Sequence, residues 1–352
     1  MMSADWFRRI PALPKIDLHR HLEGSVRLAT LIDIALEYGI EMPEYDIETL
    51  RPFVQVMPGG LRTPQHFLSK FMTLRQFFRS PEVIQRVTAE AVADAAADRV
   101  VYLELRFTPA ALSNIIRCDY HEVIGWVSQV AAKAAAEHGI QVRLIVSMNR
   151  HESVEIGARV LAAARPFLGN GVVALDLAGN EQDFPAAPFT GIFEQARADG
   201  FGITIHAGEW AGPESIQTAV YELGAERIGH GVRLIEDSAL LADLVERGTV
   251  LEVCPSSNLD SGVVSSWDSH PLPALCRQQV RTTINTDDPL VSNITLSDEL
   301  ARAVSHLDLT LDEIKRQMLH AVEAAFLLPG ERAALAAWFN DEWERVLNGG
   351  GD

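Results

Sequence analysis

The sequence has few cysteines, and they lie far apart. Only three occur among 352 residues, at Cys118, Cys254 and Cys276. Such a small, odd and widely spaced set argues against a disulfide framework and is typical of proteins from a reducing compartment. The first 15 residues also lack the apolar segment of a secretory signal peptide. We therefore expect a cytoplasmic protein.

Long apolar runs and blocks of basic residues are also missing. No window approaches the roughly 18 consecutive apolar residues that a membrane-spanning helix requires. The formal net charge is −18, from 48 acidic and 30 basic residues. Because nucleic acid and anionic membranes both bind clustered Lys and Arg, this balance argues against either partner. The 47% of hydrophobic residues, in contrast, is enough for a large buried core.

Short runs rich in Val, Ile and Leu alternate with longer segments of helical periodicity. Several runs are apolar without strict alternation, as expected for parallel strands buried on both faces. The expected strands lie near residues 15–21, 100–107, 141–148, 172–177, 202–206, 227–230, 249–253 and 281–285. This α/β pattern predicts a single (β/α)₈ TIM barrel with additional helices. A doubly wound open sheet is the alternative, although no Gly-x-Gly-x-x-Gly follows the first strand.

Residues typical of helix ends mark several of the expected helices. Ser25 is placed to cap a helix over residues 26–38, which would end at Gly39. Pro213 is placed to open a helix over residues 214–223. These signals are consistent with helices that connect successive parallel strands.

The chain carries no Pro/Ser-rich linker, charge block or low-complexity tract that would mark a domain boundary. We therefore expect residues 1–352 to form one domain. Residues 46–79 form a long insertion after the first helix, and residues 331–347 form a final helix that we expect to pack outside the barrel.

Reactive side chains recur where the expected strands end. His19 and His21 close the first strand, and residues two apart on a strand point to the same side. The other polar residues at strand ends are His206, Glu209, His230, Asp287 and Asp288. In a parallel barrel the carboxyl ends of the strands meet at one rim. Alone, His19 and His21 also fit surface residues at a strand end, and the others fit a turn or a helix cap. Together, imidazoles and a carboxylate with a position for water favour a catalytic zinc or similar divalent ion.

Six segments, in their order and spacing, resemble the adenosine deaminase family of metal-dependent amidohydrolases. They are PKIDLHRHLEGS (14–25), DLAGNE (176–181), HAGE (206–209), RIGHG (227–231), CPSSN (254–258) and NTDDP (285–289). The resemblance implies a barrel with one Zn²⁺ per chain, bound by His19, His21, His206 and Asp287. It also implies that a metal-bound hydroxide attacks C6 of a purine nucleoside and that ammonia leaves.

The same resemblance implies roles for residues that do not bind the metal. Glu209 would protonate purine N1, and His230 would orient the water and help to deprotonate it. Asp288 would pair with N7, and the backbone N–H of Gly179 would donate to N3. These proton movements fit the chemistry, because the reaction must break the aromaticity of the purine before ammonia can leave.

Two further features concern the substrate. Phe67 and Phe71, at helical spacing within residues 64–71, resemble the apolar lid of the family, although they also fit an ordinary packing face. Glu23 stands where well-known adenosine deaminases place Asp to bind the ribose 5′-hydroxyl. Relatives with Glu include enzymes that act on adenine and on aminodeoxyfutalosine. Adenosine or 2′-deoxyadenosine is the expected substrate, and those two compounds are the alternatives.

Two other classes of protein are weighed against this interpretation. A two-metal barrel hydrolase of amides or phosphoesters would need a bridging carboxylated Lys or Glu on a middle strand, yet residues 177–179 read Leu-Ala-Gly. A non-catalytic metal-binding barrel would have no need of Glu209, His230 and Asp288. No feature of the sequence indicates an oligomeric state.

Overall fold

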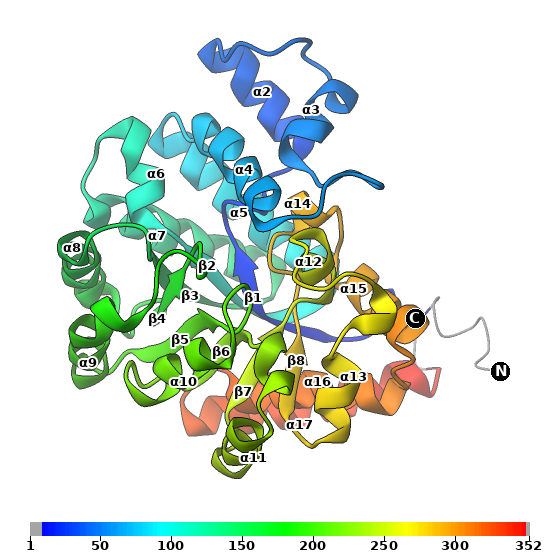
Figure 1. Cartoon of the computed structure of the whole chain (residues 1–352). Coiled ribbons are helices and arrows are strands. Elements are labelled where there is room, and N and C mark those ends of the chain that lie inside the picture. Colours follow the sequence, from blue (N-terminus) through cyan, green and yellow to red (C-terminus); the bar gives the residue numbers. More distant parts are fainter. Residues whose placement is uncertain (1–8, 350–352) are drawn as a thin grey trace.

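Eight parallel strands form a nearly closed barrel in a computed structural model that describes residues 9–349 (Figure 1). Each strand pairs with the next one along the chain, from β1 to β8. The strands are β1 (Lys15–His21), β2 (Val100–Phe107), β3 (Gln141–Asn149), β4 (Val172–Ala178), β5 (Gly202–Ala207), β6 (Arg227–His230), β7 (Val250–Val253) and β8 (Arg281–Ile284). The predicted TIM barrel is confirmed, and the doubly wound open sheet is wrong.

Helices connect the strands and surround the barrel. The α-helices are α2 (Leu28–Tyr38), α3 (Ile47–Val54), α4 (Pro64–Leu74), α5 (Pro81–Ala97), α6 (Pro109–Ile116), α7 (Tyr120–His138), α8 (Val154–Ala164), α9 (Thr190–Asp199), α10 (Pro213–Tyr221), α11 (Ser238–Arg247), α12 (Pro255–Asp260), α13 (Leu272–Arg277), α14 (Pro289–Ser292), α15 (Leu296–Leu307), α16 (Leu311–Ala324) and α17 (Pro329–Leu347). The 3₁₀ turns are η1 (Ile10–Ala12), η2 (Arg75–Phe77), η3 (Arg165–Phe167), η4 (Ala187–Phe189), η5 (Val232–Glu236) and η6 (Trp267–Ser269). Within residues 9–349, none of the helices has an apolar stretch long enough to span a bilayer.

The barrel closes where the chain leaves β8 and meets β1. The backbone N–H of His21 donates to the carbonyl of Asp287 at 2.8 Å, and the N–H of Asp287 donates to the carbonyl of His19 at 2.7 Å. Asn285 adds a third link, because its Oδ1 accepts from the N–H of Leu18 at 3.0 Å. Closure therefore brings Asp287 next to the two histidines at the end of β1.

The start of α2 differs from the sequence-based expectation. Ser25 does not cap this helix, because its Oγ donates to the carbonyl of His21 at 2.6 Å. The helix begins at Leu28 after an extended Arg27, without a side-chain cap. Its end is as expected, at Gly39 in the left-handed conformation. Ser25 instead stabilises the turn by which the chain leaves β1.

The insertion and the C-terminal helix lie on opposite sides of the barrel in Figure 1. Helices α2 and α3 project from one end of the molecule, and α4 lies between them and the barrel. At the other end, α16 packs against β1 and β8, and α17 packs against α16. Buried Leu335, Phe339 and Trp343 form the inner face of α17. The carboxyl ends of the strands therefore face the insertion, which is where the candidate site is found.

Candidate metal centre and active site

Four side chains from three strand ends meet at the mouth of the barrel: His19 and His21 on β1, His206 on β5 and Asp287 just after β8. Nε2 of His206 lies 3.1 Å from Nε2 of His19 and 3.3 Å from Nε2 of His21. Oδ1 of Asp287 lies 3.3 Å from Nε2 of both His19 and His21. Ligand atoms about 2.0 Å from a tetrahedral zinc are about 3.3 Å apart. The group therefore fits one zinc ion.

Two buried carboxylates determine which ring nitrogens face this centre. Nδ1 of His19 lies 2.8 Å from Oε2 of Glu252, and Nδ1 of His206 lies 2.9 Å from Oδ1 of Asp176. Each Nδ1 carries a proton and donates it, so the two Nε2 atoms present lone pairs. Burial lowers the pKa of His206 and, more strongly, that of His21, which favours the neutral rings that bind metals. Because facing lone pairs repel, the arrangement calls for a cation between them.

A buried arginine joins these two carboxylates. Arg106 places Nη2 2.7 Å from Oε2 of Glu252 and Nη1 3.5 Å from Oδ2 of Asp176. Burial alone would raise the pKa of both carboxyls, but Arg106 and Arg227 hold the pKa of Glu252 well below its ordinary value. His206 and Arg106 likewise lower the pKa of Asp176. Both carboxylates therefore stay ionised and keep accepting hydrogen bonds from the metal-centre histidines.

Glu209 is a buried acid beside this centre. Burial raises the pKa of its carboxyl well above the ordinary value, and the negative charges of Asp287 and Glu181 raise it further. Its Oε2 lies 3.7 Å from Nε2 of His230, and its side chain lines a cavity next to the metal group. The raised pKa favours the carboxylic acid form, which can donate a proton.

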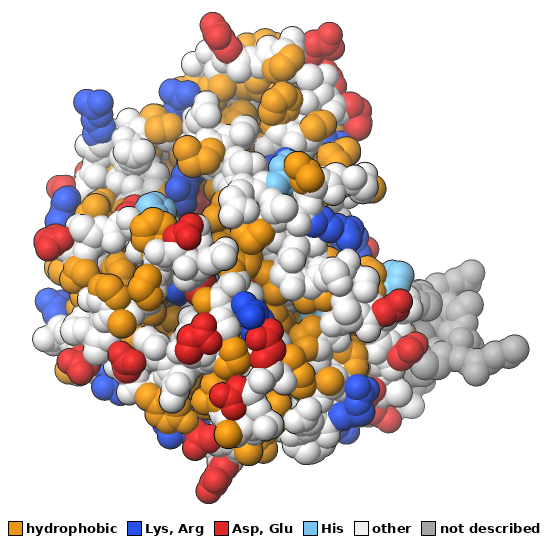
Figure 2. Space-filling view, viewed as in Figure 1, with side chains coloured by type: hydrophobic (Ala, Val, Ile, Leu, Met, Phe, Trp, Pro, Cys, Tyr) orange, Lys and Arg blue, Asp and Glu red, His pale blue; other side chains and the backbone are white. Residues whose placement is uncertain are grey.

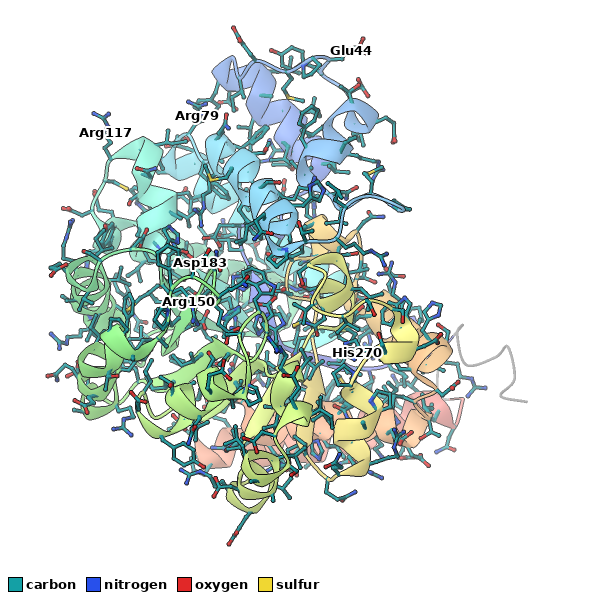
Figure 3. The ribbon with its side chains drawn as sticks, viewed as in Figure 1. Glu44, Arg79, Arg117, Arg150, Asp183 and His270 are labelled. Carbon is teal, nitrogen blue, oxygen red and sulfur yellow. The ribbon has the colours of Figure 1, made fainter. Side chains whose placement is uncertain are left out.

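The loop that carries Glu209 is held by two residues outside it. The carboxylate of Glu181 accepts the backbone N–H groups of residues 208–211 at 2.6 to 3.1 Å. Arg150, labelled near the centre of Figure 3, donates from Nη2 to the carbonyls of His206 at 2.5 Å and Leu177 at 3.3 Å. These bonds join the ends of β4 and β5 and fix the position of Glu209.

His230 ends β6 in the left-handed conformation, with φ of 61°. Its Nδ1 lies 3.1 Å from the amide Nδ2 of Asn258, so that in this amide orientation Nε2 carries the ring proton. Nε2 lies 4.0 Å from Oδ2 of Asp287, an oxygen that also accepts from Ser257 Oγ at 2.6 Å. Burial lowers the pKa of His230 well below its ordinary value. The residue is therefore a neutral ring that points an N–H toward the metal group.

Glu23 and Asp288 each present a buried oxygen that has no partner among the described residues. Oε1 of Glu23 accepts the backbone N–H of Thr108 at 2.9 Å, which leaves Oε2 free. Burial raises the pKa of both carboxyls, and the charge of Asp287 raises that of Asp288 further. Gly24 permits this packing, because a Cβ there would lie 1.9 Å from Oδ1 of Asp288. Both oxygens are available to a ligand.

These groups surround one cavity. Its lining consists of His21, Glu23, Phe67, Leu68, Phe71, Arg75, Thr108, Asn149, Ala178, Gly179, His206, Glu209, Trp210, His230, Asp287 and Asp288. Every site residue expected from the sequence is in this set except His19, which lies fully buried behind it as part of the metal group. The rings of Phe67 and Phe71, on α4, are 5.9 Å apart. The cavity thus joins an apolar side from the insertion to a polar side from the strand ends.

Cys254 also lies near the metal group, in a set with His230 and Asp287. Burial raises the pKa of its thiol well above the ordinary value, and its Sγ lies 3.6 Å from the carbonyl of Glu252. A metal-binding cysteine must lose its proton. The protonated thiol of Cys254 is therefore better suited to packing than to metal binding.

Sequence reasoning did not assign roles to several residues that organise this site: Arg106, Arg150, Asp176, Glu181, Glu252 and Asn258. Asp176, Glu181 and Asn258 stand in segments that the family resemblance singled out, so their positions were marked although their contacts were not. Glu252 is the one charged residue of β7, and Arg106 shares the otherwise apolar β2 with Glu104. A buried charge in a predicted strand was the available signal, since such a charge requires a partner.

Comparisons with known proteins place the chain in one family. A family model described as adenosine deaminase matches residues 14–341. The adenosine deaminase of Klebsiella pneumoniae (strain 342) is 38% identical over 326 residues, which cover 92% of this chain and 97% of that protein.

The chain is also similar to solved structures of an amidohydrolase and of a deaminase. An amidohydrolase from Burkholderia ambifaria with bound Zn has a TM-score of 0.89 and 25% identity, covering 99% of this chain and 95% of its own. The Arabidopsis N6-mAMP deaminase has a TM-score of 0.84 and 28% identity, covering 96% of this chain and 99% of its own.

Proposed function

Because this chain belongs to the adenosine deaminase family, we propose that it converts adenosine and 2′-deoxyadenosine into inosine and 2′-deoxyinosine. The family and its deaminase neighbours identify the reaction class as hydrolytic deamination of a 6-aminopurine. Water is consumed, the C6–N bond breaks, and ammonia leaves. The choice of nucleoside is the part that we propose.

His19, His21, His206 and Asp287 would hold the single Zn²⁺ of this enzyme, as the 3.1 to 3.3 Å spacing of their ligand atoms supports. A bound zinc ion lowers the pKa of a water molecule toward neutrality and so supplies a nucleophile at ordinary pH. Glu252 and Asp176 keep two of the rings in the orientation that this requires.

The burial of Glu209 beside the metal group is the observation that carries the mechanism. Attack at C6 places negative charge on the purine ring, and a proton delivered to N1 neutralises it. Glu209 is buried, its pKa is raised and its side chain lines the cavity. Its carboxylic acid would donate to N1 as the C6–O bond forms.

His230 would contribute a hydrogen bond to the attacking water, and Asp288 would contribute one to the purine ring. The Nε2–H of His230 would orient the attacking water, a role that its contact with Asn258 supports. Purine N7 is an acceptor, and the raised pKa of Asp288 supplies the proton that a hydrogen bond to N7 needs. The N–H of Gly179, whose φ is 103°, would donate to N3.

The free Oε2 of Glu23 would accept from, or donate to, a hydroxyl of the ribose. Phe67 and Phe71 would cover the nucleoside from α4. A free base would leave Oε2 of Glu23 without a partner, and an unpaired buried polar atom is costly. Glu23 therefore favours a nucleoside over adenine. None of the three cysteines is in a disulfide, which supports a cytoplasmic location.

A substrate panel tests the proposal. The zinc-loaded protein should release ammonia from adenosine and 2′-deoxyadenosine with kcat/KM on the order of 10² times that for adenine. 5′-Methylthioadenosine and aminodeoxyfutalosine complete the panel. Release of ammonia from none of these 6-aminopurines would reject the proposed function. Selective turnover of adenine or aminodeoxyfutalosine would reject the choice of nucleoside and keep the reaction.

A further inference from the structure

Arg75 brings a positive charge to the cavity from the insertion. It follows α4 directly and begins η2. Among the described residues that line this cavity, it is the only Lys or Arg. A cation is favourable at the C-terminus of a helix, which accounts for the charge of Arg75. It does not account for the fact that Arg75 also lines the substrate cavity.

The guanidinium of Arg75 has donor capacity that the described residues leave unused. Its Nε is buried and has no hydrogen-bond acceptor within residues 9–349. Trp210, which lines the same cavity, has a buried Nε1 that also lacks an acceptor within residues 9–349. A buried donor without an acceptor costs free energy, and more so when it is charged. Both donors are therefore available to an acceptor that arrives with the substrate.

The position of Arg75 indicates which part of the substrate it meets. Its charge acts on Glu23, which lies two residues beyond His21 on the chain. Under the proposed function, on which this inference rests, C6 of the purine faces the metal group and Glu23 meets the ribose. Arg75 is then at the 5′ end of the nucleoside, remote from the reacting carbon.

We propose that Arg75 binds an anionic group, a carboxylate or a phosphate, at the 5′ end of a 6-aminopurine nucleoside. This site therefore accepts 5′-anionic nucleosides as well as adenosine, and Arg75 sets the preference between them. The planar guanidinium carries donors in the geometry that carboxylate and phosphate oxygens match. Adenosine, with a neutral 5′-hydroxyl, makes no such ion pair.

The test compares kcat/KM for adenosine, adenosine 5′-monophosphate and adenosine-5′-carboxylic acid in the zinc-loaded enzyme. Arg75→Gln should lower kcat/KM for the preferred anionic substrate about tenfold to a hundredfold, with less than about a threefold change for adenosine. Arg75→Lys should restore part of the loss. The two anionic substrates distinguish a phosphate site from a carboxylate site.

Arg79→Gln is the matched control, because Arg79 lies in the same segment but outside the cavity, at the edge of the molecule in Figure 3. This control substitution should leave kcat/KM unchanged for all three substrates. The proposal is wrong if the wild-type enzyme uses neither anionic nucleoside, or if Arg75→Gln lowers all three rates equally. Calorimetric binding of inosine, inosine 5′-monophosphate and inosine-5′-carboxylic acid gives the same comparison without turnover. It therefore tests Arg75 even if the proposed function fails.

Discussion

Glu209→Gln is expected to lower kcat for adenosine by about 10²- to 10⁴-fold while the protein keeps its zinc. Glutamine fills the same space and can still donate a hydrogen bond to purine N1, but it cannot transfer a proton. Since Glu209 is not in the metal group, metal content should not change. Ammonia release at saturating adenosine and zinc content by plasma mass spectrometry, measured on one sample, check both parts.

Glu214→Gln is the control for this variant. Glu214 lies five positions further along, in the first turn of α10; it is exposed and does not line the cavity. Its replacement should leave kcat unchanged within about twofold. Near-normal activity of Glu209→Gln would show that another group protonates the purine.

His19→Ala is expected to lose zinc and activity together. Nε2 of His19 lies within 3.1 to 3.3 Å of the ligand atoms of His206 and Asp287, so its loss opens the group on its buried side. The expected loss of kcat/KM is on the order of 10³-fold or more, because the nucleophile depends on the metal. Zinc retention after dialysis and ammonia release measure the two effects.

The His19→Ala substitution also removes the Nδ1–H that donates to Glu252. The folding of the variant must therefore be checked by circular dichroism and thermal unfolding. His138→Ala, at the exposed end of α7, is the matched control and should keep zinc, activity and stability. A folded His19→Ala protein that kept both its zinc and its activity would remove His19 from the set of ligands.

The barrel could be predicted from the sequence because its strands are short, continuous apolar runs. Each expected strand matches the observed one within one residue at either end. Helix starts were harder to predict, as α2 shows. Ser25 has the residue type of a cap, but its hydroxyl bonds to the carbonyl of His21 instead. Such a choice between local partners depends on the path of the chain after β1, which local sequence does not encode.

The polar residues at the strand ends were predictable for a different reason. A parallel barrel gathers those ends on one rim, so His19, His206 and Asp287 meet although they lie far apart in sequence. The buried supports did not follow from that rule. Arg106 and Glu252 are 146 positions apart and pair across the barrel interior. Nothing near either residue in sequence specifies the other, so only the folded structure shows that they orient the histidines.

The face shown in Figure 2 has basic side chains scattered among acidic and apolar ones, without a continuous positive area. The functional features of the described chain are concentrated in the cavity instead. They are a metal group of three imidazoles and one carboxylate, the buried acid Glu209 with its raised pKa, and two buried oxygens without partners among the described residues.

Titration of the metal-free protein with zinc tests this account most directly. Ammonia release from adenosine should rise in proportion to added zinc and stop rising at one equivalent per chain, since His19, His21, His206 and Asp287 form a single group. A rise that continued to two equivalents would indicate a two-metal hydrolase. Zinc binding without any ammonia release would contradict the central claim that this group, with Glu209 beside it, deaminates a purine nucleoside.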